Sequence, residues 1–124
     1  MAVLNYILLA VRDPLESARL YNRLLGAEPV HSASDFVLYA LPTGLKIGLW
    51  ATGEMQPPPL PPGGSELTFS LPDVESVRSL YAVWVDLGLS VLQEPTETGF
   101  GFTFVLADPD GHRLRAFVRA ENPS

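Results

Sequence analysis

The chain has 124 residues, of which 47% are hydrophobic and 18% are charged. This length fits one domain of ordinary size, and this balance is typical of globular rather than disordered proteins. Eight lysine and arginine residues against fourteen acidic ones give a net charge of -6. Because nucleic-acid phosphates attract basic surfaces, we expect no nucleic-acid partner.

Two further absences narrow the class of protein. No apolar run approaches the roughly 18 residues of a membrane helix, and the first residues lack the basic start of a signal peptide. We therefore expect a cytoplasmic protein that does not bind a membrane. The chain contains no cysteine, which excludes disulfides, thiolate metal sites and cysteine nucleophiles.

The first half of the chain predicts one helix and four strands. Residues 3–11 form an aliphatic, β-branched run of strand length. Asp13 and Pro14 then provide an N-cap and a first helical residue, and apolar residues at helical spacing continue to a stop at Gly26. Turn residues separate three further predicted strands. These strands span residues 29–32, 36–40 and 45–50.

The second half of the chain repeats this pattern. The segment Leu-Ala-Val-Arg-Asp at 9–13 is echoed 60 residues later by Phe-Ser-Leu-Pro-Asp at 69–73. The turn Leu-Pro-Thr-Gly at 41–44 is echoed by Asp-Pro-Asp-Gly at 108–111. Similar spacing in both halves indicates two copies of one structural unit. The second copy is then predicted to contain a strand at 66–71, a helix at 73–87 and strands at 90–93, 102–107 and 113–118.

A proline-rich connector separates the two copies. Residues 55–64 hold five of the twelve prolines, which predicts an extended, semi-rigid linker; a ligand for an SH3-type domain is the alternative. We therefore divide a single domain into a first module, a linker, a second module and a short tail. Their bounds are 1–50, 51–64, 65–119 and 120–124.

Each module has the element order βαβββ, which predicts an α+β fold. A four-stranded sheet covered by one helix on one face leaves its other face bare. Pairing two such tandem modules would form a cupped, eight-stranded mixed sheet with the helices on the outside. The cavity of that cup is where we expect the functional site.

The residues that recur in the two copies carry a family resemblance. They are Leu9-x-Val11-x-Asp13 before a helix with Leu20-Tyr21 and Leu25-Gly26, and Asp108-Pro-Asp-Gly-His112-Arg-Leu114 near the C-terminus. With these motifs the chain resembles the glyoxalase, bleomycin-resistance and extradiol-dioxygenase superfamily, the vicinal oxygen chelate fold. The resemblance covers nearly the whole chain. It implies the fold more strongly than an activity, because one fold hosts many functions.

The resemblance also implies where a metal would bind. In metal-dependent members each module supplies one ligand from its first strand and one from its last, and these positions fall on Tyr6, Gly48, Glu66 and Arg115. Only Glu66 is a good donor, and the protonated Arg115 would repel a cation. The chain therefore looks like the metal-free bleomycin-resistance branch. We expect neither a metal nor a cofactor, since no glycine-rich loop precedes a helix as a nucleotide site would require.

Strand parity predicts the lining of the cup, because alternate residues of a strand face opposite sides of a sheet. We assume that the turns pair Ala40 with Leu45 and Ala107 with His112. The predicted ligand-binding residues are then Tyr6, Tyr39, Gly48, Trp50, Glu66, Phe102, Phe104, Arg115 and Phe117. This aromatic lining favours a planar, partly polar small molecule. A register error of one residue would instead place aromatic rings in the core.

Three functions fit this lining. The first is sequestration of a small aromatic compound, such as an antibiotic or a toxic metabolite, without turnover. The second is an enzyme of the same fold, a lyase, isomerase or dioxygenase relative, with Glu66 as general base or within an unusual metal site. The third is a non-catalytic regulatory or interaction module whose cup is filled with side chains. Under any of the three, Glu66 and Arg115 could form an ion pair that holds the cup shut, which does not exclude contact with a ligand. The resemblance and the bare sheet faces also predict a homodimer.

Overall fold

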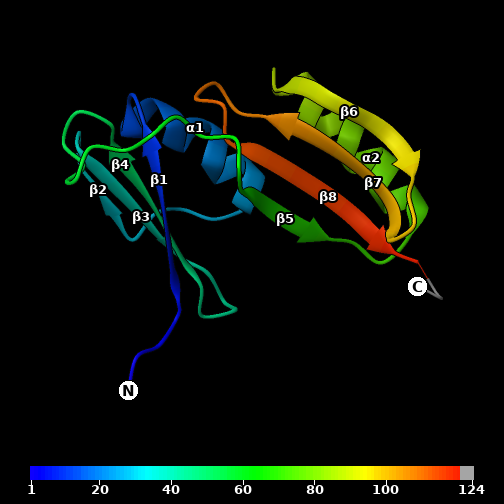
Figure 1. Cartoon of the computed structure of the whole chain (residues 1–124), viewed down its shortest axis with the longest axis horizontal. Coiled ribbons are helices and arrows are strands. Elements are labelled where there is room, and N and C mark those ends of the chain that lie inside the picture. The colour runs from blue at the N-terminus through cyan, green and yellow to red at the C-terminus, as the bar shows by residue number, and fades with distance from the viewer. Residues whose placement is uncertain (121–124) are drawn as a thin grey trace. The chain divides into compact units, whose positions relative to one another are not determined.

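The computed structural model describes residues 1–120 and divides the chain into two compact units. Unit 1 is Met1–Leu60, and unit 2 begins at Pro61. Of the tail predicted at 120–124, residues 121–124 lie outside the described residues. Figure 1 shows one helix and one sheet in each unit.

Unit 1 contains a four-stranded sheet and the helix α1 (Pro14–Leu25). Its strands lie in the order β1-β4-β3-β2, with β1 parallel to β4 and the other pairs antiparallel. The strands are β1 (Tyr6–Val11), β2 (His31–Ser32), β3 (Phe36–Ala40) and β4 (Lys46–Ala51).

Unit 2 has the same topology, with the helix α2 (Val74–Asp86). The sheet order is β5-β8-β7-β6, and β5 is parallel to β8. The strands are β5 (Glu66–Ser70), β6 (Ser90–Glu97), β7 (Gly101–Ala107) and β8 (Arg113–Arg119). The predicted α+β fold of two tandem βαβββ modules is confirmed, with the eight strands divided between two sheets.

Both helices begin where the sequence predicts. The Asp13 side chain accepts a hydrogen bond from the Glu16 backbone N–H at 3.2 Å, and Asp73 accepts one from Ser76 at 2.7 Å. These caps satisfy N–H groups that have no partner within the helix. Helix α1 ends at Gly26, whose positive φ of 60° suits a residue without a side chain. Within residues 1–120, neither helix is long and apolar enough to cross a membrane.

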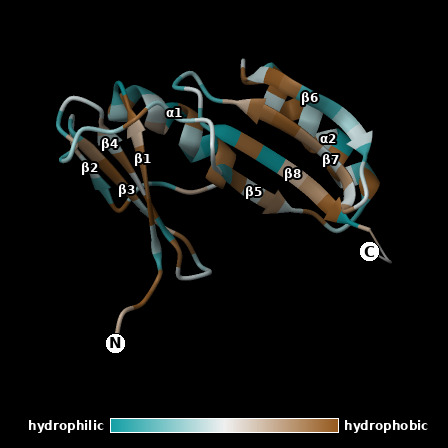
Figure 2. Cartoon of the chain, in the orientation of Figure 1, coloured by the Kyte–Doolittle hydropathy of each residue, from teal (hydrophilic) through white to brown (hydrophobic). Residues whose placement is uncertain are grey.

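The core of unit 2 lies between α2 and one face of its sheet. Trp84 of α2 is 2% exposed and makes edge-to-face contacts with Phe69 of β5 and Phe104 of β7, at centroid distances of 5.0 and 5.5 Å. Figure 1 shows α2 behind the sheet, and Figure 2 shows hydrophobic colour along β7. The opposite face of this sheet is therefore the one that is available for polar side chains.

The two hairpins that precede β4 and β8 pair differently from our prediction. Ala40 lies opposite Lys46, not Leu45, and Ala107 lies opposite Arg113, not His112. Each turn contains a glycine with positive φ, 93° at Gly44 and 98° at the equivalent position of the second turn. A turn of this kind adds one residue to the loop and shifts the pairing register by one.

This shift corrects three predicted site residues. Tyr39, Phe102 and Phe104 lie on the faces packed against the helices, so the prediction that they line an open cavity is wrong. Tyr39 is fully buried, and its hydroxyl donates to Asn22 Oδ1 of α1 at 2.6 Å. Burial raises the pKa of Tyr39 to about 12. Phe102 lies under the guanidinium of Arg78 of α2, 4.7 Å from its ring centroid.

Strand β6 extends four residues beyond its predicted end. The extension includes Pro95, and proline cannot donate a hydrogen bond to a sheet ladder. In the structure β6 is an edge strand, and its pairing with β7 shifts register between Gln93 and Thr96. An edge position with a bulge tolerates proline, so β6 continues to Glu97 and extends the sheet face on which the candidate site lies.

Candidate functional site

The face of the unit 2 sheet opposite α2 carries a row of polar side chains. Glu66 of β5 pairs with Arg113 of β8 in the ladder, and Thr68 pairs with Arg115. Arg115 in turn lies opposite Val105 of β7, which pairs with Gln93 of β6. Side chains from all four strands are therefore brought to one face, although they are far apart in the sequence.

One carboxylate on this face binds two arginines. Arg115 donates from Nε to Glu66 Oε1 at 2.7 Å and from Nη2 to Oε2 at 3.2 Å, which is a two-pronged contact. Arg113 Nη2 lies 2.7 Å from the same Oε2. A third donor of Arg115, Nη1, reaches Thr103 Oγ1 at 3.1 Å. The planar guanidinium is therefore held in one orientation, as the fork geometry of arginine favours.

These contacts decide the charge state of Glu66. The hydrogen bond from Arg115 holds the pKa of Glu66 below its usual value, against the opposing effect of partial burial. The positive charges of Arg115 and Arg113 act in the same direction. Glu66 is thus a stable anion near neutral pH. A carboxylate that resists protonation in this way is a poor general base.

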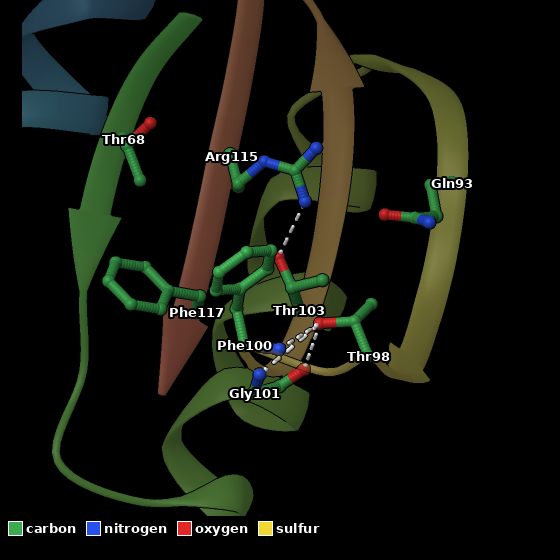
Figure 3. A pocket seen from close by; sticks show the side chains of 8 residues that line it. All are labelled: Thr68, Gln93, Thr98, Phe100, Gly101, Thr103, Arg115 and Phe117. Atoms are coloured by element: carbon green, nitrogen blue, oxygen red, sulfur yellow. Dashed lines mark hydrogen bonds between the residues drawn. The ribbon is translucent and has the colours of Figure 1, made fainter. Parts of the chain in front are cut away.

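A cavity of about 410 Å³ lies on the same face. Figure 3 shows the Arg115 guanidinium, the Gln93 carboxamide and two phenylalanine rings around it. The lining residues come from β5 to β8 and from the β6–β7 turn: Thr68, Gln93, Thr98, Phe100, Gly101, Thr103, Arg115 and Phe117. Most of its surface is apolar with a few placed polar groups, which is typical of small-molecule sites.

The β6–β7 turn holds an exposed aromatic ring at the cavity. Thr98 Oγ1 donates to the Gly101 carbonyl at 2.7 Å and accepts from the N–H groups of Phe100 and Gly101 at 3.3 and 3.2 Å. These contacts close the turn around one threonine (Figure 3). The ring of Phe100 is 74% exposed even so. An exposed ring on a well-anchored turn is positioned to contact a bound molecule.

Unit 1 carries the remaining predicted site residues. Tyr6, Gly48 and Trp50 belong to the face of its sheet opposite α1, as their ladder pairing requires. Lys46 Nζ lies 5.0 Å from the centroid of the Tyr6 ring. A Cβ at Gly48 would come within 2.9 Å of the Leu8 and Phe36 side chains, so the missing side chain is what lets these residues pack.

Comparison with known proteins identifies the fold family. The model of the Glyoxalase/Bleomycin resistance protein/Dioxygenase superfamily matches residues 3–116. The chain belongs to this superfamily. The phenazine antibiotic resistance protein EhpR of Enterobacter agglomerans is 31% identical over 114 residues, which are 90% of this chain and 88% of that protein.

Solved structures share the fold of this chain. A protein from Agrobacterium tumefaciens, known from a solution structure, is 38% identical, with a TM-score of 0.90 over 97% of this chain and 99% of the other. A glyoxalase-related enzyme from Fulvimarina pelagi is 22% identical, with a TM-score of 0.84 over 100% and 96% of the two chains. At that identity the second likeness concerns the fold alone.

The metal positions of the superfamily do not fit a metal ion in this chain. Both oxygens of Glu66 are engaged by arginines, Arg115 has no lone pair to donate, and Gly48 has no side chain. Within residues 1–120 there is no group of three His, Asp or Glu side chains that could hold a metal ion. Metal independence stays a prediction.

Sequence reasoning located part of this site. Glu66, Arg115 and Phe117 lie on the predicted face of unit 2, and the last two line one cavity. Gln93 and Phe100 were not predicted as site residues, because the strand predicted at 90–93 was not assigned to a face and the turn after it was not predicted. Signals for that turn were present: the Thr-Gly-Phe-Gly sequence at 98–101 carries two glycines, which are typical of a tight hairpin connection.

Proposed function

We propose that this protein binds a planar aromatic compound, such as an antibiotic or a toxic metabolite, and sequesters it without converting it. The observation that carries the proposal is the cavity of about 410 Å³ beside Phe100 and Phe117. Flat rings favour stacking on aromatic side chains, and the fixed guanidinium of Arg115 offers a polar contact at the edge. Sequestration of this kind needs affinity but no reacting group.

Two further observations support this proposal. EhpR is named for resistance to phenazine antibiotics, and phenazines are flat, fused-ring aromatic molecules. The enzyme alternative with Glu66 as base is not favoured, because the pKa of Glu66 is lowered rather than raised. The residues of unit 1, Tyr6, Gly48 and Trp50, stay predicted ligand contacts.

A binding experiment with phenazine tests the proposal. We expect saturable binding by calorimetry at one site per chain, and recovery of chemically unchanged phenazine by mass spectrometry. The Phe117→Ala variant should bind about tenfold more weakly, because it removes one stacking surface. Phe100 is exposed and lies outside the core, so the Phe100→Ala variant should fold normally and also bind phenazine more weakly.

The matched control is Val83→Ala on α2, a side chain that is 52% exposed and does not line the cavity. It should bind phenazine as tightly as the unchanged protein. Equal affinity in all three variants would contradict a site at the cavity. A chemically altered product would contradict sequestration and favour an enzyme.

We also propose that the protein works as a homodimer. Strand β1 lies at an edge of its sheet, and its side chains Tyr6, Ile7 and Leu8 are 50%, 37% and 45% exposed. Apolar side chains gathered on an edge strand favour association. Light scattering should give twice the chain mass of 13.5 kDa, and a particle of the single-chain mass would contradict this part of the proposal.

A further inference from the structure

One wall of the cavity holds a hydrogen-bond acceptor that the protein does not use. Among residues 1–120, two buried side-chain atoms have no hydrogen-bond partner, Gln93 Oε1 and Arg113 Nε. Gln93 lines the cavity. Figure 3 shows its carboxamide extending from β6 toward Arg115 and Thr103, with the oxygen end leading.

Of the donors around Gln93, the two threonine hydroxyls and three of the five N–H groups of Arg115 are engaged elsewhere. Arg115 donates from Nε and Nη2 to Glu66 and from Nη1 to Thr103. The Thr103 hydroxyl donates to the Ala116 carbonyl at 2.8 Å. The Thr98 hydroxyl donates its one hydrogen to the Gly101 carbonyl at 2.7 Å. A hydroxyl group whose single hydrogen is already donated can take part in further hydrogen bonds only as an acceptor.

This part of the cavity wall therefore presents one buried acceptor without a partner, Gln93 Oε1, near the guanidinium of Arg115. A buried acceptor without a partner is unfavourable, because it has lost its hydrogen bonds to water and gained none in return. A ligand that donates a hydrogen bond to it relieves that penalty, whereas a ligand of the same shape without a donor leaves the acceptor unpaired. Discrimination of this kind is strong because it depends on a group that is shielded from water.

We propose that Gln93 selects the ligand, and that the site prefers flat aromatic molecules with an N–H or O–H donor in the plane of the ring system. This inference rests on the proposed function and narrows its ligand class. Gln93 would accept the hydrogen bond at the rim of the rings, while Phe117 and Phe100 contact their faces. Glu66 does not line the cavity, and its carboxylate is paired with Arg115 and Arg113 instead.

The test compares two probes that differ in one group, an aminophenazine and a methylphenazine substituted at the same ring carbon. The unchanged protein should bind the amino compound about tenfold more tightly by calorimetry. Gln93→Leu should lose this preference and bind the two compounds alike. Gln93→Glu keeps an acceptor at the same place, so this variant should retain the preference for the amino compound.

Folding is checked separately by urea denaturation without ligand. Gln93→Leu removes an unpaired buried acceptor, so its unfolding midpoint should not fall below that of the unchanged protein. Equal affinity for the two probes, or a preference that survives in Gln93→Leu, would overturn the role of Gln93 and leave the proposed function standing. Binding of neither probe, nor of phenazine itself, would overturn both.

Discussion

Replacing Gly101 by alanine is expected to lower the free energy of unfolding by about 4 kcal/mol, since it adds both backbone strain and a steric clash. Gly101 has a φ of 150°, a conformation that residues with a side chain rarely adopt. A Cβ there would clash with the backbone carbonyl oxygen of Val118 on the neighbouring strand β8. A backbone atom within a sheet cannot move aside as a flexible side chain can.

The same turn provides the matched control. Gly99 lies two residues earlier, has no positive φ, and a Cβ there would meet no atom within 4 Å. Gly99→Ala should therefore leave the unfolding midpoint in urea nearly unchanged. The Gly101→Ala protein should also bind phenazine more weakly, because Gly101 closes the turn that presents Phe100. Equal free energies of unfolding for the two variants would contradict the prediction, because they would mean that the turn accommodates the added methyl group without loss of stability.

A second large loss of stability is expected when the charge of Glu66 is removed. Glu66→Gln removes the negative charge between Arg113 and Arg115 and should lower the free energy of unfolding by about 2 kcal/mol, since it leaves two partly buried cations without their anion. The side chains of Glu66 and Arg115 are only 23% and 27% exposed. Glu16→Gln is the control, because its contact with Arg19 is exposed to solvent and 3.7 Å long. That variant should show no measurable change.

The lowered pKa of Glu66 adds a dependence on pH. A carboxyl whose pKa is lower in the folded state than in the unfolded chain contributes stability above its unfolded value of 4.5. That contribution is lost as pH falls below 4.5 toward the folded pKa. The stability difference between the unchanged protein and Glu66→Gln, measured by urea denaturation, should therefore shrink as pH falls below 4.5. A difference that stays constant into that range would contradict the role of the charge.

The fold was predictable because its signals are local and repeated. Asp13 and Asp73 cap helices at equivalent positions, and apolar residues recur at helical or strand spacing between turns. Strand parity predicted that Glu66 and Arg115 share one sheet face, and the ladder register places them on the same face. Their contact adds what strand parity cannot show, namely that one carboxylate is shared by two arginines.

The parts that sequence reasoning missed depend on long-range pairing. Whether Tyr39 faces a cavity or a helix is decided by one residue of register in the hairpin before β4, and a glycine bulge sets that register. Whether β6 continues past Pro95 depends on its place at the edge of the sheet. Neither the pairing register nor the position of a strand in the sheet can be predicted from the residues of that strand alone.

By itself the sequence determined the element order, the duplication and the chemical character of the residues available to a site, because these follow from composition, period and turn residues. The superfamily was predicted from the resemblance of its motifs. Only the tertiary structure decided which of those residues meet. It buried Phe104 against α2, joined Arg115 to Glu66, and brought Gln93 and Phe117 from separate strands to one cavity. The physical reason is that side-chain facing alternates with every residue, so a single bulge reverses it for a whole strand.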